Sequence, residues 1–401
     1  MNRYRHPSAL FLAALLAASP AIARQATPEA AAPAATDFAA RGRALALDAL
    51  IVDTHVDVPY RLQEKMEDIS VRTATGDFDY PRAVEGGLDA PFMSIYVPAA
   101  LQETPGASKQ LADQLIDMVE KFVKDWPDKF ALAATPADLL ANRITGRISL
   151  PMGMENGAPI EQDLANVEHF WRRGIRYITL THGKDNQICD SSYSPAGERK
   201  WKGLSPFGKE VVAEMNRVGI MVDVSHVSDA AFDQAIAISK APLLVSHSSA
   251  RHFTPGFERN LDDARIKKLA KKGGVISINF GSSFLTEAAN KWSVAAWEKQ
   301  AAYLKESGVA SGSPEAKAWE EQYEQDNPLP YATLDDVVAH IDHVVKIAGI
   351  DTSASARIST ASATPCRPAS RAWPTTPTWS PSCSRWATAR PTSRRSSAAT
   401  W

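Results

Sequence analysis

One short stretch of the chain decides its fold: Leu50-Ile51-Val52-Asp53-Thr54-His55-Val56-Asp57. The run is apolar and rich in β-branched residues until it ends in His-x-Asp, a pattern that predicts a buried strand with two metal-type ligands at its C-terminal end. Side chains alternate along a strand, so His55 and Asp57 would point the same way and could bind one cation together. His-x-Asp also occurs at ordinary strand ends with solvated polar residues, so a metal site requires further ligands from the rest of the chain.

Beyond this stretch, short apolar runs alternate with longer amphipathic ones. Further strands are predicted at 91–97, 148–155, 177–182, 219–226, 242–247 and 274–280, and helices at 109–124, 162–173, 205–217, 229–240, 261–272 and 334–348. This alternation indicates a parallel sheet covered by helices, either doubly wound or closed as a (β/α)8 TIM barrel. Seven strands precede Gly281 and one more is due after the last helix, and a total of eight favours the barrel.

The predicted strand ends carry a repeated set of metal-type side chains. They are His55, Asp57, Glu155, His182, His226 and His247, whereas the other five histidines fall in the leader, in helices or in a loop. A single histidine at a strand end is usually a packing or hydrogen-bonding residue. The C-terminal strand ends of a barrel converge on one mouth, however, so these six side chains are expected to meet there.

Three imidazoles and two carboxylates from this set would suit two divalent ions, and zinc, which takes imidazole and carboxylate ligands, is the first candidate. Glu155 has two carboxylate oxygens and could bridge both ions from a central strand. Two nearby metals would lower the pKa of a shared water to give hydroxide near neutral pH, polarise a carbonyl and stabilise an oxyanion, so amide hydrolysis is the natural reaction. His182 could be a ligand or an electrophile toward the substrate oxyanion, and the sequence leaves both roles open.

The composition fits a soluble protein that acts on small molecules. The chain has 401 residues, of which 44% are hydrophobic, which is enough for one large core or two modest ones. Its net charge of -2 and its pI of about 6.5 provide no basic field for nucleic acid or anionic lipid. Three cysteines, Cys189, Cys366 and Cys383, do not indicate a disulfide framework.

The N-terminal residues have the layout of a secretory signal peptide. Two arginines precede an apolar run at 9–18 and the small-x-small sequence Ala21-Ile22-Ala23, so we expect a signal peptide over 1–23. The apolar run is too short to span a bilayer, and no cysteine near the cleavage point offers a lipid anchor. We therefore expect an exported protein, periplasmic or secreted, without a stable membrane anchor, and a flexible spacer over 24–40.

Five motifs occur in order along the chain. They are Val52-Asp53-Thr54-His55-Val56-Asp57, Gly153-Met154-Glu155-Asn156-Gly157, Tyr177-Ile178-Thr179-Leu180-Thr181-His182, Asp223-Val224-Ser225-His226, and Ser246-His247-Ser248-Ser249-Ala250 with Arg259-Asn260. Together they resemble the membrane (renal) dipeptidase family of zinc metallopeptidases, over about residues 47–351. The resemblance implies a (β/α)8 barrel of the metal-dependent hydrolase type, which we place at 41–351.

The resemblance also implies a two-zinc centre with assigned ligands. His55 and Asp57 would bind one zinc ion, His226 and His247 would bind the other, and Glu155 would bridge the two and take part in catalysis. In that arrangement a metal-bridging hydroxide would attack the peptide bond.

Two further residues acquire roles from the resemblance. His182 would contact the substrate at the scissile carbonyl, and Arg259 would bind the C-terminal carboxylate of a dipeptide, a role that suits a planar guanidinium. The implied substrates are dipeptides, often with a D-residue tolerated at the C-terminal position. Dimerisation is implied by the resemblance alone.

Residues 282–331 form a longer connection than a barrel needs. The segment is rich in charged residues and contains Trp292, Trp297 and Trp319. We interpret it as an inserted helical excursion near the barrel mouth or at a subunit contact, with a solvated helical hairpin as the alternative.

The composition changes abruptly after Asp351. Residues 352–401 contain no Leu, Val, Gly, Lys, Asp or Glu, so we expect the last barrel strand and the closing helix to be lost and this tail to be disordered. A base missing at the Asp351/Thr352 boundary would explain the change, because in the shifted frame 352–361 can be decoded as His-Val-Gly-Ile-Gly-Ser-Asp-Phe-Asp-Gly. That decoding resembles the family's eighth strand, whose active-site aspartate would fall at Ile358.

Two other functions remain open from the sequence. One is an inactive, truncated homologue that binds small peptides or metal, which the missing eighth strand favours. The other is a different amidohydrolase-type hydrolase, such as a lactonase or a cyclic-imide hydrolase, which would often carry a carboxylated lysine where this chain has Glu155. Zinc content and dipeptide hydrolysis with and without chelator discriminate among the three.

Overall fold

The computed structural model describes residues 37–356, with the side chains of 354–356 left out. The predicted signal peptide, all but the last residues of the predicted spacer, Ile358 and the closing helix lie outside the described residues. No helix within the described part is long and apolar enough to cross a membrane.

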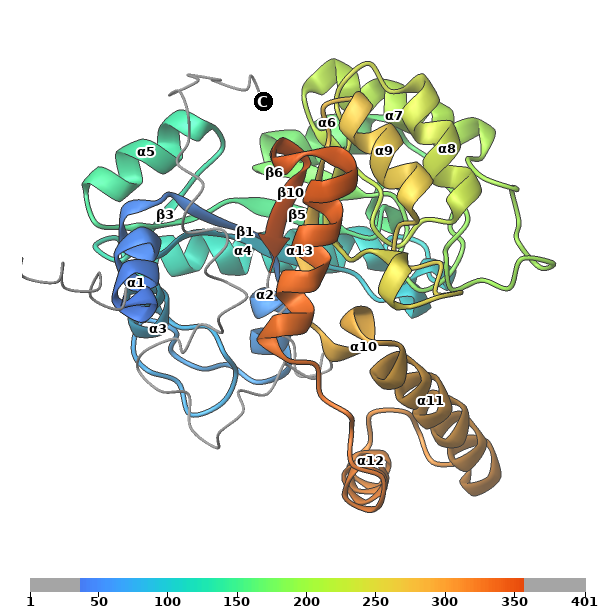
Figure 1. The fold of residues 1–401 in the computed structure, drawn as a ribbon. Coiled ribbons are helices and arrows are strands. Elements are labelled where there is room, and N and C mark those ends of the chain that lie inside the picture. Colours follow the sequence, from blue (N-terminus) through green and yellow to red (C-terminus); the bar gives the residue numbers. More distant parts are fainter. Residues whose placement is uncertain (1–36, 357–401) are drawn as a thin grey trace, which may run out of the picture. The chain divides into compact units, whose positions relative to one another are not determined.

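Eight parallel strands form the main sheet, in an order that follows the chain. They are β1 (Ile51–Val56), β2 (Leu88–Tyr96), β5 (Met152–Glu155), β6 (Ile175–Thr179), β7 (Met221–Asp223), β8 (Leu244–Ser248), β9 (Val275–Asn279) and β10 (Ser353–Ala356). Helices lie between successive strands and cover the outside of this sheet (Figure 1). The predicted (β/α)8-type barrel is confirmed.

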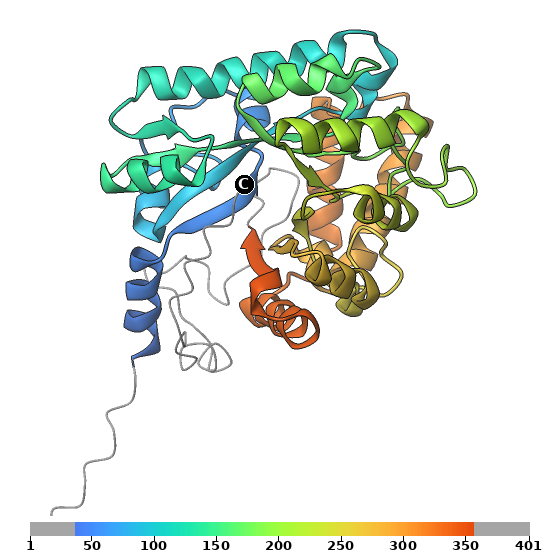
Figure 2. The same ribbon diagram turned by 90° about the horizontal axis from the view of Figure 1, so that it is seen from above.

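The eighth strand corrects one expectation. Residues 353–356 do form a strand, which pairs in parallel with β9 from Ser353↔Ile276 to Ala356↔Asn279. Strand pairing uses backbone N–H and C=O groups, so the exposed edge of β9 can recruit a segment whose side chains would not predict a strand. Figure 2 shows β10 as a short arrow after α13 (Leu334–Ala348). Within the described residues the ladder ends at β10 and does not pair it with β1, so the barrel is nearly closed.

The predicted strand at 148–155 is two strands. Pro151 separates β4 (Ile148–Leu150) from β5, and β4 pairs with β3 (Phe130–Leu132) in a second, two-stranded sheet. A proline has no backbone N–H to donate to a ladder, which explains the break. Only β5 continues into the barrel, where it delivers Glu155 at its C-terminal end.

The predicted helices form close to their predicted bounds. Besides α13, they are α4 (Ala107–Asp125), α6 (Ala165–Arg172), α7 (Pro206–Val218), α8 (Asp229–Ile238) and α9 (Asp263–Lys271). Several begin at a side-chain cap: Ser205 accepts from Gly208 N–H before α7, and Ser228 accepts from Ala231 N–H before α8. Such caps satisfy backbone donors that the first turn leaves free, and so fix where each helix starts.

Seven helices were not predicted individually. Four of them are α1 (Phe38–Asp48), α2 (Val58–Glu64), α3 (Tyr80–Gly86) and α5 (Pro136–Ile144). The other three, α10 (Ser282–Leu285), α11 (Glu287–Ser307) and α12 (Pro314–Asp326), lie in the segment predicted as a helical insertion. Figure 1 shows α11 and α12 beyond α10, apart from the helices that cover the barrel.

A tyrosine fills the middle of the barrel. Tyr177 of β6 is fully buried and pairs in register with Gly153 of β5. A Cβ at Gly153 would come within 2.0 Å of the tyrosine ring, so the glycine leaves the space that the ring occupies. Phe92 and Leu244 pack on the same ring and form an apolar layer below the polar strand ends.

Candidate metal centre

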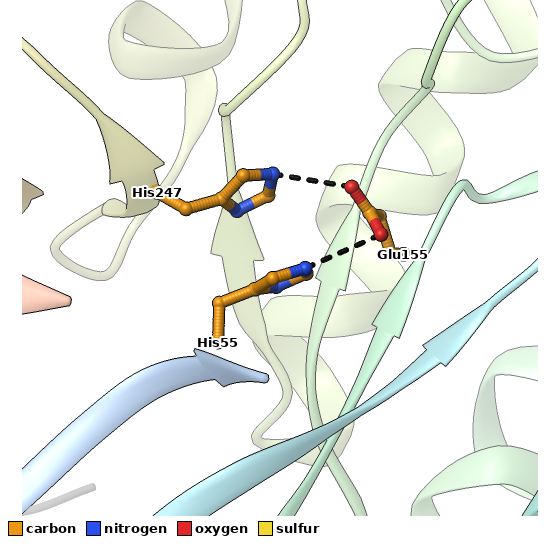
Figure 3. Close-up of side chains that lie close together, drawn as sticks. All are labelled: His55, Glu155 and His247. Carbon is orange, nitrogen blue, oxygen red and sulfur yellow. Dashed lines mark ion pairs between the residues drawn. The ribbon is translucent and has the colours of Figure 1, made fainter. Parts of the chain in front are cut away.

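Four imidazoles surround one buried carboxylate at the C-terminal ends of the strands. The Nε2 atoms of His226, His247 and His182 lie 3.0, 3.1 and 3.5 Å from Glu155 Oε1. His55 Nε2 lies 3.3 Å from the other oxygen, Oε2. Figure 3 shows His55 and His247 reaching Glu155 from separate strands.

The remaining predicted ligand completes this group. Asp57 Oδ1 lies 3.3 Å from His55 Nε2, although Asp57 follows the end of β1 and occupies the N-cap position of α2. The prediction that both side chains point to one place therefore holds in space, while the strand itself is shorter than predicted. His182 and His226 likewise stand three residues beyond β6 and β7, in the loops that follow.

One of these loops has an unusual backbone. His226 has a φ of 68°, in the left-handed region that residues with a Cβ seldom adopt. This conformation costs of the order of 1–3 kcal/mol and persists where surrounding contacts enforce it, as they often do at functional sites. It turns the His226 ring back over the strand ends, where its Nε2 meets Glu155.

The described residues fit a metal ion at this point. His55 Nε2 and Asp57 Oδ1, which lie 3.3 Å apart, are buried polar atoms without a hydrogen-bond partner among the described residues. Leaving such atoms unsatisfied in the interior is costly unless a ligand contacts them. Imidazole nitrogens and carboxylate oxygens are also the donors that zinc takes. The centre thus has both the chemistry and the unmet bonding capacity of a metal site.

Two overlapping groups of candidate ligands share Glu155. One joins it with His55 and His247, and the other with His182 and His226; in each group the ligand atoms lie within 4.8 Å of one another. The predicted pairs were His55 with Asp57 and His226 with His247. The geometry brings all six side chains together without separating them into those pairs.

The electrostatics of the centre come from burial and from the carboxylate. Burial and the nearby guanidinium of Arg259 lower the pKa of His226, and burial lowers the pKa of His247 and of His182. Burial alone would raise the pKa of Glu155, but His55 and His182 hold it well below its usual range. Neutral imidazoles around an ionised carboxylate are the protonation states that bind a divalent cation.

His55 is the exception among the four imidazoles. Burial would lower its pKa, but the neighbouring Tyr177, Glu155 and Asp57 raise it well above the ordinary value. Two of these neighbours, Glu155 and Asp57, are the carboxylates that lie beside His55 Nε2 at 3.3 Å.

Arg259 lies beside the metal centre and is fully buried. Its Nη2 donates to His247 O at 2.8 Å, its Nη1 donates to Ser248 Oγ at 2.5 Å, and its Nε has no hydrogen-bond partner among the described residues. The ring of Phe284 lies under the guanidinium at 5.2 Å. A buried, partly unsatisfied guanidinium suits a carboxylate ligand.

His182 is the member of the centre that is open to solvent. Its side chain is 23% exposed, against 1–6% for the other three imidazoles. The ring of Tyr96 packs edge-on against it at 4.8 Å, and Tyr60 packs in the same way on Tyr96. His182 is therefore the imidazole of the centre that solvent can reach.

Sequence reasoning missed several polar residues behind the centre. The Tyr177 hydroxyl lies 2.9 Å from His55 Nδ1, and Ser246 Oγ lies 2.7 Å from both His247 Nδ1 and Asp223 Oδ2. In the quoted motifs, Ser246 directly precedes His247 and Asp223 lies three residues before His226. This closeness to the predicted ligands could have indicated their supporting role. Tyr177 opens one of the quoted motifs, but in the sequence it looks like an ordinary aromatic strand residue.

A family model matches most of the chain. The model described as membrane dipeptidase, peptidase family M19, matches residues 39–354. The match ends three residues after Asp351, where the composition changes.

Among curated relatives, an uncharacterized dipeptidase of Schizosaccharomyces pombe is 30% identical over 318 residues, which are 75% of this chain and 66% of that protein. Dipeptidase 3 of Mus musculus is 32% identical over 259 residues, 61% of this chain and 50% of that one. The chain thus spans less than two thirds of the length of both relatives.

Solved structures share the fold. The probable dipeptidase PvdM from Pseudomonas aeruginosa superposes with a TM-score of 0.69 at 22% identity and covers 83% of this chain and 89% of that one. A metallopeptidase from Rhodobacter sphaeroides, solved with a phosphinate mimic of the dipeptide L-Ala-D-Ala, gives a TM-score of 0.63 at 22% identity, with 79% and 87% covered. The match of the family model over more than half of the sequence decides the family: this chain belongs to the membrane dipeptidase family, peptidase family M19.

Proposed function

We propose that this chain is a zinc-dependent dipeptidase that hydrolyses the peptide bond of dipeptides. The observation that carries the proposal is the convergence of four imidazoles on buried Glu155, with the buried guanidinium of Arg259 beside them. The first set suits divalent metal, and the second suits the free carboxylate of a small substrate.

The proposed metal ligands are those that the family resemblance implies. His55 and Asp57 would hold one zinc ion, His226 and His247 would hold the other, and Glu155 would be a ligand of both. When bound, two such ions would activate water as a nucleophile at neutral pH and act as a Lewis acid toward the carbonyl oxygen. The side chains of this chain fix where that chemistry takes place.

Arg259 binds the C-terminal carboxylate of the substrate. Its position is fixed by His247 O and Ser248 Oγ, and its Nε has hydrogen-bonding capacity to spare. Arg259 Nη2 lies 2.9 Å from His226 Nε2, so a carboxylate bound by the guanidinium would lie close to the proposed metal ligands. This closeness supports a short substrate such as a dipeptide.

His182 supports the carbonyl of the scissile bond. Its lowered pKa keeps the ring neutral, so one ring nitrogen carries a hydrogen that can be donated to the developing oxyanion. Its partial exposure supports a position at the substrate side of the centre. We also propose that a D-residue is accepted at the C-terminal position, which the L-Ala-D-Ala mimic in the Rhodobacter sphaeroides metallopeptidase supports.

Export to the periplasm or beyond the cell is part of the same proposal. It is supported by the signal-peptide layout of residues 1–23. Fractionation of cells that express the full chain tests it: the mature protein should start near residue 24 and be absent from the cytoplasm.

The function is tested by metal content and hydrolysis measured together. Purified protein should bind about two zinc ions and hydrolyse L-Ala-L-Ala and L-Ala-D-Ala, and it should lose activity in chelator and regain it with zinc. Glu155→Gln should abolish both zinc retention and hydrolysis. The matched control is Glu168→Gln, because Glu168 forms only surface ion pairs with Arg172 and Arg217.

A non-catalytic binding protein is the second candidate. It is favoured by β10, whose sequence Ser353-Ala354-Ser355-Ala356 brings no carboxylate to the strand end. Zinc binding and dipeptide binding without turnover would support this candidate and overturn the dipeptidase. Hydrolysis of lactones or cyclic imides in preference to dipeptides would overturn both.

A further inference from the structure

The three imidazoles proposed as zinc ligands differ in what their other ring nitrogen contacts. His55 Nδ1 lies 2.9 Å from the hydroxyl of Tyr177, and His247 Nδ1 lies 2.7 Å from Ser246 Oγ. His226 Nδ1 has no hydrogen-bond partner among the described residues. Two of the three rings are thus held by a hydroxyl on the side away from Glu155.

The direction of the Tyr177 hydrogen bonds follows from a count of hydrogens. The tyrosine hydroxyl also lies 3.0 Å from the backbone oxygen of Thr54, which can only accept. A hydroxyl has one hydrogen, so Tyr177 donates it to Thr54 and accepts from His55 Nδ1–H. Nε2 of His55, which faces Glu155 and Asp57, is then the nitrogen left to bind a metal.

The same count applies to Ser246. Its Oγ lies 2.7 Å from Asp223 Oδ2, and this fully buried carboxylate also accepts from Thr179 Oγ1 at 2.5 Å and from Ser225 Oγ at 3.0 Å. An ionised carboxylate only accepts, so the single hydrogen of Ser246 goes to Asp223. Ser246 Oγ then accepts from His247 Nδ1–H and leaves Nε2 of His247 to the metal.

Both hydroxyls are fixed by their surroundings. Tyr177 is fully buried opposite Gly153, so its ring cannot swing away without disturbing β5. Ser246 is fully buried as well, and its backbone N–H donates to Asp223 Oδ1 at 2.9 Å. The hydroxyls therefore act on the histidines from a rigid frame.

We propose that Tyr177, and Ser246 supported by Asp223, are positioning residues that hold His55 and His247 with the hydrogen on Nδ1, so that Nε2 of each binds zinc. This inference rests on the proposed zinc dipeptidase and adds how the chain orients its ligands. Partners of this kind fix ring orientation and raise ligand basicity, and their loss typically weakens metal binding 10- to 100-fold.

The test compares zinc affinity in variants that lose only a hydroxyl. Tyr177→Phe keeps the ring over Gly153, and Ser246→Ala keeps the backbone hydrogen bond to Asp223. Competition with a chromogenic chelator should show that each variant binds one of its two zinc equivalents about 10-fold more weakly or worse. Unchanged affinity for both equivalents in both variants overturns the inference.

Matched controls separate this effect from simple loss of packing. Tyr80→Phe removes a tyrosine hydroxyl whose ring packs on Phe130, and Ser239→Ala removes a buried serine hydroxyl after α8. Both controls should bind zinc as the unmodified protein does. If the unmodified protein itself binds no zinc, the proposed function fails, and that result is distinct from a failure of this inference.

A spectroscopic readout does not depend on any variant. Long-range ¹H–¹⁵N correlation spectra of the zinc-loaded, unmodified protein report which nitrogen of each histidine carries hydrogen. His55 and His247 should both show a protonated Nδ1. An unprotonated Nδ1 at either residue overturns the role of its hydroxyl, whatever the variants show.

Discussion

The Nε2 atoms of His226 and His247 lie only 2.8 Å apart, and both face the same oxygen of Glu155. Nη2 of Arg259 lies 2.9 Å from the same His226 nitrogen. One ring nitrogen has either one hydrogen or one lone pair, so it cannot satisfy the histidine, the carboxylate and the guanidinium together. A cation between these groups would accept the lone pairs of both rings, and this crowding leads to the first prediction.

Zinc should stabilise the folded chain strongly. A ligand that binds only the folded state at 100 times its dissociation constant adds about 2.7 kcal/mol for each site. Differential scanning fluorimetry should therefore show a higher melting temperature with zinc and a lower one after chelation. Calcium, which prefers oxygen ligands, is the control ion and should leave the melting temperature of the chelator-treated protein unchanged. Equal effects of both ions would contradict an imidazole-rich site.

Arg259→Lys should damage recognition of the substrate carboxylate. The variant keeps a positive charge but loses the planar fork that binds a carboxylate through two hydrogen bonds. We expect kcat/KM for L-Ala-L-Ala to fall by about 100-fold, which is close to 3 kcal/mol, mainly through KM.

Two comparisons sharpen this prediction. The unmodified protein should discriminate strongly between a dipeptide and its C-terminal amide, and Arg259→Lys should lose most of that discrimination. Arg217→Lys is the control, because Arg217 pairs with Glu168 and Glu214 on the surface. If Arg259→Lys lowered kcat/KM equally for the dipeptide and its amide, the arginine would have a structural role and would not bind the substrate carboxylate.

Gly153→Ala should destabilise the barrel. Its new Cβ would come 2.0 Å from the buried ring of Tyr177, and overpacking of this kind costs about 1–3 kcal/mol or more. Urea denaturation in chelator measures the loss without a contribution from metal. Gly86→Ala is the matched control, since nothing lies within 4 Å of a Cβ there and alanine favours the helix. If Gly153→Ala left the free energy of unfolding unchanged, the ring of Tyr177 would be free to move aside.

The sequence predicts the strand-borne part of the site well and the loop-borne part less well. Glu155 and His247 lie at strand ends that an apolar run makes visible. His226 also reaches the centre, but it does so through a positive φ that no residue pattern announces. Convergence of barrel strand ends was still enough to group all six side chains, because the barrel brings the loops to one mouth.

Arg259 shows what the pattern of residues cannot predict. In the sequence it stands beside Glu258 and looks like half of a surface ion pair. In the structure, Glu258 pairs with Arg199 at 2.6 Å while Arg259 turns into the core. The tertiary contacts of two neighbouring residues therefore separate them, and only the family resemblance pointed to the role of the second.

The short strand β10 forms although the sequence predicted that the eighth strand would be lost. Its Ser-Ala-Ser-Ala sequence has no strand signal, yet backbone pairing with β9 is sufficient to hold it. The insertion helices were predicted only as a segment, because α11 and α12 bury few side chains and so carry little periodic signal. Local sequence reports a strand or helix poorly where tertiary contact alone maintains it.

Acid should destabilise the chain through His340. This buried residue accepts from Ala250 N–H at Nδ1 and donates from Nε2 to Leu285 O, both at 3.0 Å, so it must be neutral. Burial lowers its pKa to about 4, below the value near 6.5 in the unfolded chain. Between these values the unfolded state binds the extra proton, so stability is full above pH 6.5 and falls as the pH drops toward 4.

The size of this effect can be isolated by a variant. From pH 7.5 to pH 4.5 His340 alone should lower the free energy of unfolding by about 2 to 3 kcal/mol. Glutamine does not titrate, so His340→Gln lacks this contribution. Between pH 7.5 and pH 4.5 the free energy of unfolding, measured by urea denaturation in chelator, should therefore fall less in the variant than in the unmodified protein, by this amount. Identical pH dependence in the two proteins would show that folding does not shift the pKa of His340.

The frame of the coding sequence determines how well the barrel closes. In the chain as written, β10 is short, the ladder does not pair it with β1, and the Ser353 hydroxyl is buried without a hydrogen-bond partner among the described residues. Sequencing the coding DNA should reveal one base missing at the Asp351/Thr352 boundary. A chain expressed in the restored frame should melt at a higher temperature and hydrolyse dipeptides faster, because an apolar eighth strand with its aspartate would replace the tail. The nearly closed barrel would be the functional form if two results were found together. The DNA would show no missing base, and the chain as written would hydrolyse dipeptides as fast as the restored chain.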